Sequence, residues 1–165
     1  MDIKQRIKNT LINLNRLNET VSNLTDINVS KEELLEILKG YLEAALWTEE
    51  ESLREDYENQ FDYSEDINLG TLGIDDLDDN SKIQAYMDIR DFISYAGDEA
   101  ISEAIDDNGT FQLGMDIWLT RNGHGSGFFD HSYIFEKNLM DAAKKLKGVD
   151  LYLGDDLKLY FSNSN

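Results

Sequence analysis

The N-terminal two-thirds of the chain repeats apolar residues every three or four positions, the period of amphipathic helices. In residues 2–24 one apolar stripe is flanked by Lys, Arg and Asn; it consists of Ile3, Ile7, Leu11, Leu14, Leu17, Val21 and Leu24. This spacing predicts a first helix. Because it approaches a heptad repeat, the helix could pair with a second copy in a homodimer. The alternative is that it packs onto its own domain.

A second helix is predicted over residues 31–47. Ser30 and Glu33 have the spacing of a capping box at its start. Its predicted buried face is Leu34, Leu35, Leu38, Leu42, Ala45 and Leu46. Gly40 lies inside this helix, where glycine costs about 1 kcal/mol relative to alanine. Close packing of Gly40 against another element would explain that cost.

Short helix and loop are predicted over residues 48–80. A third helix follows over residues 81–106, with Asn80 or Ser81 as its N-cap. Gly97 lies inside this helix, and we expect the helix to kink there or to split in two.

After residue 110 the apolar period changes from 3.6 to two. Residues 116–121 alternate and predict a strand, and residues 128–130 begin a second strand. A helix with a lysine-rich end is predicted over residues 133–147. Residues 150–153 and 157–161 flank a Gly-Asp-Asp turn and predict a final hairpin. The C-terminal unit is therefore expected to be a small antiparallel ββαββ sheet with one helix across it.

These elements predict an α+β fold, mostly helical in its N-terminal two-thirds and followed by the ββαββ unit. The expected parts are an N-terminal amphipathic helix (1–28), an acidic helical region (29–110) and the sheet unit (111–165). Residues 29–165 are expected to form one folded domain. A chain of 165 residues buries roughly 70% of its unfolded surface, which is enough for a core.

The composition excludes several classes of protein. The chain has no cysteine, so disulfides, thiolate metal sites and a cysteine nucleophile are ruled out. No long apolar run follows the first basic residues, and nothing approaches the roughly 20 apolar residues of a membrane span. We therefore expect a cytoplasmic protein that makes no contact with a membrane.

Charge is concentrated in the middle of the chain. The net charge is −19, and residues 41–110 hold 21 acidic residues against three basic ones, a net charge of −18. Such a region repels nucleic acid and attracts basic surfaces. The densest part predicts a partner-binding acidic surface made of Glu49, Glu50, Glu51, Glu55, Asp56, Glu58, Asp62, Glu65, Asp66, Asp75, Asp76, Asp78 and Asp79.

Aromatic residues interleave with these acids. Tyr57, Phe61 and Tyr63 allow the segment to become ordered by burying their rings. The alternative interpretation of the acidic surface is a solvated face that only keeps a small protein soluble.

A glycine-rich turn is the second candidate site, formed by Trp118, Arg121, Asn122, Gly123, His124 and Gly125. Arg121, His124 and the glycine backbone to Gly127 would hold an anion, with Trp118, Phe128 or Phe129 available for stacking. The turn does not match a phosphate-binding loop, because the predicted element after it is a strand and the Walker lysine is missing. The alternative is a structural hairpin turn rich in glycine.

Catalysis and metal binding find little support. The candidate metal ligands lack the tight spacing of zinc sites; they are His124, His131, Asp116 and Asp130. A general base at His124 would need a nucleophile nearby, and spacing alone offers Ser126 or Thr120. We therefore predict no metal, no cofactor and no enzymatic activity.

The C-terminal motifs resemble a group of uncharacterised small proteins encoded by bacteriophages and prophages. Residues 116–130 match their aromatic-Leu-Thr-Arg-Asn-Gly-His-Gly-x-Gly motif, and residues 152–156 match their Tyr-x-Gly-Asp-Asp hairpin. The Glu-Ala-Ala-Leu-Trp segment at 43–47 is also similar, so the resemblance extends over residues 41–161. It implies a phage or prophage accessory gene acting in the host cytoplasm, and it supplies no catalytic residues.

Charge and this resemblance together suggest a function. We expect an acidic, DNA-mimicking binding protein that inhibits a host nucleic-acid-targeting defence, of the anti-CRISPR or antirestriction type. Its partner would be the basic surface of a CRISPR effector or restriction enzyme, with no direct contact to nucleic acid. Two alternatives remain: a small-ligand or nucleic-acid-binding protein that uses the turn from Arg121 to Gly127, and a structural or assembly protein.

Overall fold

The computed structural model describes residues 2–22, 27–61 and 68–163. Its elements are α1 (Ile3–Ser22), α2 (Lys31–Thr48), α3 (Glu50–Gln60), η2 (Leu69–Thr71), η3 (Ile74–Asp76), α4 (Asp79–Ala96), α5 (Asp98–Asn108), α6 (Thr110–Arg121), η4 (Phe128–Asp130), α7 (Glu136–Lys145), β1 (Val149–Leu153) and β2 (Leu159–Asn163). Within the described residues, no helix combines the length and apolar character that a bilayer span requires.

Helices α2 and α6 form the centre of the fold, and their backbones touch where they cross. A Cβ at Gly40 would lie 1.9 Å from the carbonyl oxygen of Phe111, and one at Gly114 would lie 1.9 Å from that of Ile37. The predicted close packing of Gly40 is therefore confirmed. The capping box at the start of α2 is confirmed too, because Ser30 and Glu33 cap each other's backbone N–H.

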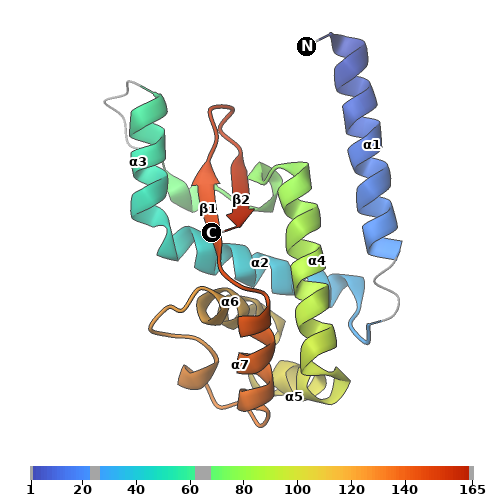
Figure 1. The fold of residues 1–165 in the computed structure, drawn as a ribbon, viewed down its shortest axis with the longest axis vertical. Helices are drawn as coiled ribbons and strands as arrows, with labels where there is room; N and C mark the ends of the chain where they lie inside the picture. Colours follow the sequence, from blue (N-terminus) through green and yellow to red (C-terminus); the bar gives the residue numbers. More distant parts are fainter. Residues whose placement is uncertain (1, 23–26, 62–67, 164–165) are drawn as a thin grey trace.

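One hydrophobic core surrounds this crossing, with members from Leu34 to Leu159. Figure 1 shows α4, α5 and α7 on one side of the crossing, α3 on the other, and α1 along the edge of the molecule next to α4. The ring of Phe92 in α4 stacks on that of Phe128, with centroids 5.8 Å apart. This contact ties the loop after α6 to the core.

The predicted third helix is two helices. Gly97, with φ of +90°, lies between α4 and α5, in the left-handed region that favours glycine. The N-cap of α4 is Asp78, whose carboxylate accepts the N–H groups of Asn80 and Ser81. The prediction that Asn80 or Ser81 caps this helix is wrong.

The predicted ββαββ unit is also wrong in its first half. Residues 116–121 are the second half of α6, and residues 128–130 are the short helix η4. Almost every side chain from Leu113 to Arg121 is buried. A helix buried on all sides shows no 3.6 period, and a short apolar run then reads as a strand.

The second half of that unit is confirmed. Helix α7 lies within the predicted range 133–147, and β1 pairs with β2 as an antiparallel hairpin in which Tyr152 faces Tyr160. Over the residues that the structure describes, the fold is mostly helical with a two-stranded hairpin, which lies between α3 and α4 in Figure 1.

Candidate functional site

The exposed side of α3 is acidic. Glu51, Glu55 and Glu58 point outward with Glu50, while Leu53 on the opposite side is fully buried. This one-sided burial fixes which face of α3 meets solvent. Glu50 and Glu51 also occupy the first turn, where negative charge stabilises a helix.

Helix α3 is attached to the edge of β1. Asp56 accepts the N–H of Leu153 at 3.1 Å, and the Gln60 side chain donates to the carbonyl of Leu153 at 2.7 Å. These bonds satisfy backbone groups that an edge strand would otherwise expose. Asp56 is therefore half-buried and structural, and it places α3 beside the hairpin.

A second group of acids lies on the other side of the hairpin, at η3 and the start of α4. Asp76 accepts the N–H of Gly73, and Asp78 caps α4 while its own N–H donates to the carbonyl of Leu159. The carboxylates of Asp76 and Asp78 are therefore used to bind backbone N–H groups of the protein itself. Asp75 is exposed and Asp79 lies 4.0 Å from Lys82.

Few cations neutralise this surface. The ion pairs at the described acidic positions are Arg54 with Glu50 at 3.0 Å and Lys82 with Asp79. In the part of the chain that the structure describes, no ion pair involves Glu51, Glu55, Glu58 or Asp75. The predicted members Asp62, Glu65 and Asp66, and the ring of Tyr63, lie outside the described residues.

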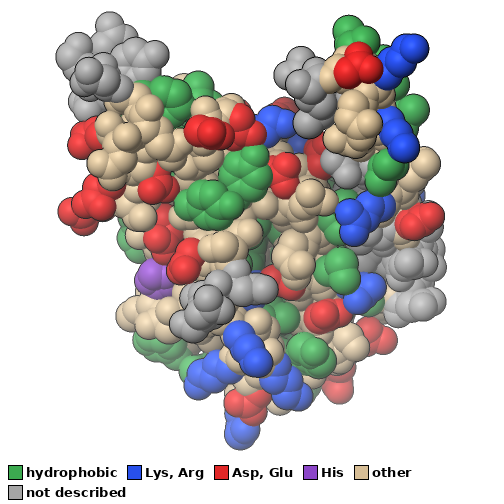
Figure 2. All heavy atoms as spheres, turned by 45° about the horizontal axis from the view of Figure 1, so that its top comes forward, with side chains coloured by type: hydrophobic (Ala, Val, Ile, Leu, Met, Phe, Trp, Pro, Cys, Tyr) green, Lys and Arg blue, Asp and Glu red, His purple; other side chains and the backbone are tan. Residues whose placement is uncertain are grey.

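On the face drawn in Figure 2, acidic side chains are frequent over α3 and toward the hairpin, and basic ones lie over α1 and around α7; further acidic side chains lie elsewhere on this face. Tyr57 packs against the core and its ring lies 5.2 Å from that of Phe61. The exposed carboxylates of α3, η3 and the hairpin are hereafter called the acidic face; they are those of Glu50, Glu51, Glu55, Glu58, Asp75, Asp150, Asp155 and Asp156.

Glu49, at the junction of α2 and α3, is half-buried. Burial raises the pKa of its carboxyl, the nearby Asp150 raises it further, and His124 lowers it. Glu49 therefore lies near both Asp150 of β1 and His124 of the glycine-rich turn.

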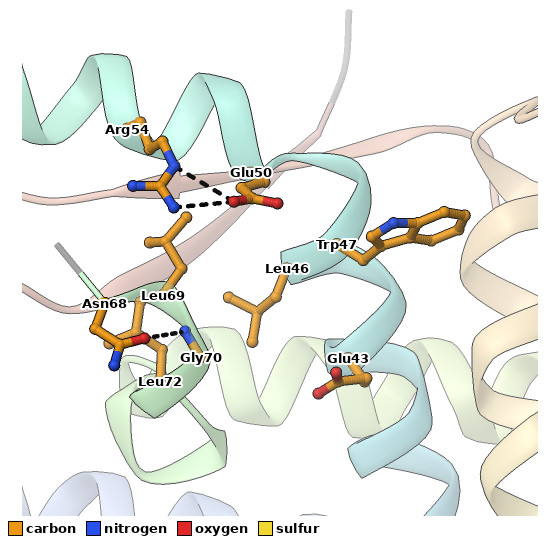
Figure 3. Close-up of a pocket in the computed structure, with 9 residues that line it drawn as sticks. All are labelled: Glu43, Leu46, Trp47, Glu50, Arg54, Asn68, Leu69, Gly70 and Leu72. Carbon is orange, nitrogen blue, oxygen red and sulfur yellow. Dashed lines mark hydrogen bonds and ion pairs between the residues drawn. The ribbon is translucent and has the colours of Figure 1, made fainter. Parts of the chain in front are cut away.

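A shallow hollow of about 370 Å³ lies between α2, α3 and η2. Figure 3 shows Leu46 and Leu69 lining it and the Glu50–Arg54 pair at one end, with Trp47 lining it at the side opposite Leu69. Trp47 is 61% exposed. The hollow has a mixed lining, in which Leu46, Leu69 and Leu72 lie beside the polar side chains of Glu43, Glu50, Arg54 and Asn68.

The hairpin presents two tyrosines that the sequence analysis did not select. The rings of Tyr152 and Tyr160 stack with centroids 5.3 Å apart and planes at 16°. The Tyr160 hydroxyl donates to Asp156 at 2.5 Å, which raises the pKa of Tyr160 and lowers that of Asp156. The alternation of apolar residues in β1 could have indicated that Tyr152 is exposed: Leu151 and Leu153 face the core, so Tyr152 between them must face away from it.

In the glycine-rich turn, the side chain of Arg121 is not placed to bind an anion as the sequence predicts. Arg121 is buried, and its guanidinium donates to Tyr41, Asp88 and the carbonyls of Leu146 and Lys147 at 2.7–3.0 Å. These bonds join α2, α4, α6 and the end of α7. Arg121 is therefore a structural residue in this fold.

Other residues of the turn also hold the fold. Trp118 is fully buried and donates to the Thr48 hydroxyl at 2.8 Å. The Asn122 side chain accepts the N–H of Val149. Of the two phenylalanines predicted for stacking, Phe128 is buried and Phe129 is 48% exposed. Gly123 adopts φ of +68° and turns the chain, next to the exposed Gly125.

Asp116 is a fully buried carboxylate. It accepts the Tyr133 hydroxyl at 2.7 Å and the Gln112 amide at 3.0 Å, and His131 Nδ1 lies 3.1 Å away. Burial raises the pKa of Asp116, opposed by these hydrogen bonds and by His131, while Asp130 raises it further. Among the described residues, no group of three or more His, Asp or Glu is placed to hold a metal ion.

Asp116 is expected to make stability depend on pH. Because its folded pKa is raised, the folded protein binds a proton more readily than the unfolded chain in the window above the ordinary carboxyl pKa of about 4. The free energy of unfolding should therefore rise as pH falls through that window. The side chain at position 116 of the variant Asp116→Asn cannot titrate, so the free energy of unfolding of this variant, measured with urea at several pH values, should change less with pH than that of the wild type. An equal change with pH in both proteins would contradict this assignment.

Comparisons with known proteins give no relative: no family model matches the chain, and neither a curated protein nor a solved structure does.

Proposed function

We propose that this protein is a phage-encoded inhibitor of a host nucleic-acid-targeting defence, of the anti-CRISPR or antirestriction type. It would bind through its acidic face and occupy the cationic surface on which its partner holds DNA or RNA. The observation that supports this most is a row of outward carboxylates on α3, those of Glu51, Glu55 and Glu58, which form no ion pair within the described residues.

The spacing of this row suits a surface built for phosphates. With a rise of about 1.5 Å per residue, α3 separates these carboxylates by about 6 and 4.5 Å along its axis. Along the axis of a DNA duplex, the phosphates of one strand are spaced by about 3.4 Å. The spacing of negative charges in this row is therefore of the same order as in a phosphate backbone. Because Leu53 and Asp56 anchor α3, the helix presents the row in a fixed geometry.

Electrostatics also suits fast and salt-sensitive binding. A net charge of −18 over residues 41–110 would steer a basic partner to this protein and repel nucleic acid. The protein itself is therefore proposed to bind protein and not nucleic acid.

The test is DNA cleavage by a panel of purified CRISPR effectors and restriction enzymes. The wild-type chain should inhibit at least one of them, and Glu51→Gln/Glu55→Gln/Glu58→Gln should weaken that inhibition by about 10- to 100-fold. This magnitude assumes that each exposed ion pair contributes up to about 1 kcal/mol.

The matched control is Asp98→Asn/Glu99→Gln/Asp106→Asn, which makes the same charge change on exposed residues of α5. It should inhibit nearly as well as the wild type. An equal loss in both triple variants would mean that net charge alone acts, and no loss in the α3 variant would reject the proposal.

A second candidate function, assembly through self-association, is favoured by α1. Ile3, Ile7 and Leu11 share one side of this helix and are 71%, 55% and 55% exposed. The side chains of Leu14, Leu17 and Val21, and all of Leu24, lie outside the described residues.

For this candidate, the full chain is expected to sediment as a dimer at micromolar concentration, and Ile7→Glu/Leu11→Glu as a monomer, because two charges on the stripe prevent its burial. A wild-type chain that remains a monomer would exclude this role for α1.

A further inference from the structure

We infer that the stacked pair Tyr152–Tyr160 is the place on the acidic face where arginine side chains of the partner bind, in preference to lysine. This inference rests on the proposed function and deepens it by naming the partner's side chain. It follows from the position, rigidity and chemical surroundings of the two rings.

The pair lies on the outer face of the hairpin. Leu151, Leu153 and Leu159 on the inner face are buried in the core, so the outer face is fixed toward solvent. Tyr152 is 42% exposed although it is a large ring. Exposed tyrosine and tryptophan that are held rigidly are typical of residues that dominate protein interfaces.

Tyr160 is held from three sides. It stacks on Tyr152 and donates its hydroxyl to Asp156. The third side is Gly154, where a Cβ would lie 2.5 Å from Cε2 of Tyr160. The absence of a side chain at Gly154 therefore makes room for the ring. A partner that stacks on this pair would lose little conformational entropy of the tyrosines, because they are already ordered.

Acidic residues outnumber basic ones around the rings: Lys158, two residues before Tyr160, is a basic neighbour, and the acids beside it keep the local charge negative. Asp150 shares the outer face of β1 with Tyr152, since side chains two apart on a strand point to the same side. Asp155 and Asp156 form the tip of the hairpin, and Asp78 is close enough to raise the pKa of Tyr160. In Figure 2 an apolar patch at the centre of the molecule, where the hairpin comes forward, is bordered by acidic side chains.

This arrangement distinguishes arginine from lysine. The flat guanidinium stacks on an aromatic face and still donates hydrogen bonds in its plane, whereas lysine is a strongly hydrated point charge. Donation of the Tyr160 hydroxyl to a carboxylate makes that ring more electron-rich. An aromatic centre with a carboxylate rim therefore complements arginine better than lysine.

The test compares binding of nona-arginine and nona-lysine peptides to the full-length protein by calorimetry at physiological ionic strength. The wild type should bind nona-arginine more tightly. Tyr152→Leu, which keeps apolar surface but removes the aromatic face, should lower nona-arginine affinity by about three- to fivefold and nona-lysine affinity by less than about twofold. Thermal unfolding checks that the variant is folded.

Tyr95→Leu is the matched control, because Tyr95 is 49% exposed and lies on α4, where Lys145 already covers its ring. It should leave both affinities unchanged. Equal losses for both peptides in Tyr152→Leu, or no loss, would overturn the inference. If Tyr152→Leu has no effect on peptide binding while the α3 triple variant loses inhibition of DNA cleavage, the inference fails and the proposed function stands; if the α3 triple variant inhibits cleavage as well as the wild type, the proposed function fails.

Discussion

Gly114→Ala is expected to lower the free energy of unfolding by about 3 kcal/mol, the upper end of the usual cost of overpacking a core, or to prevent folding. The new methyl group would lie 1.9 Å from the carbonyl oxygen of Ile37 and 2.8 Å from the nitrogen of Tyr41. Both are backbone atoms of α2, so no side chain can rotate away. Helices α2 and α6 would have to separate, and separation costs packing throughout the core.

Urea unfolding measures this effect, with Gly125→Ala as the control. A Cβ at Gly125 meets no atom within 4 Å, so that variant should stay within about 0.5 kcal/mol of the wild type, as surface substitutions usually do. Gly40→Ala should resemble Gly114→Ala, since its methyl group would meet the carbonyl of Phe111. Equal stabilities of Gly114→Ala and Gly125→Ala would contradict the helix crossing described here.

The second large effect is expected at Arg121. Arg121→Met would remove a buried cation and take the Arg121 donor from Asp88 Oδ2, from two carbonyls and from the Tyr41 hydroxyl, with Asp88 Oδ1 still accepting from Gln84. Breaking a buried ion pair by removing one partner costs about 3–5 kcal/mol. Denaturant unfolding should show a loss of this size.

Two further variants separate charge from geometry at this site. Arg121→Lys keeps the charge but cannot reach all four acceptors with a planar fork, so it should lose part of the stability. Arg121→Met/Asp88→Asn removes both charges and should recover part of it. If Arg121→Met were as stable as the wild type, Arg121 would have no structural role, and the prediction that it binds a ligand in the glycine-rich turn would again be open.

The sequence predicted the elements that are buried on one face. Helix α2 has a capping box and a clear apolar stripe, and the hairpin has alternation and a Gly-Asp-Asp turn, so both were found. Helix α6 was missed because it is buried on nearly all sides, including at Asp116 and Arg121. Burial of such polar residues is decided by partners distant in sequence, such as Asp88 and Tyr133.

The same limit applies to the candidate site. Composition located the acidic residues, and helical spacing makes those of α3 face outward. Spacing could not predict that Asp56, Asp76 and Asp78 are used for backbone hydrogen bonds. Nor could it predict that the hairpin brings Tyr152 between the two acidic groups, because that depends on the long-range contacts of β1 with α3 and of β2 with α4.

The most direct test of the central claim is a DNA displacement titration. A fluorescent DNA duplex is first bound to the CRISPR effector or restriction enzyme that the cleavage panel identifies, and the full-length protein is then added at low and at high salt. Occupation of the cationic surface predicts that the wild-type chain releases the duplex, that high salt weakens the release, and that Glu51→Gln/Glu55→Gln/Glu58→Gln releases far less. A complex in which the inhibitor and the DNA are bound together would contradict it.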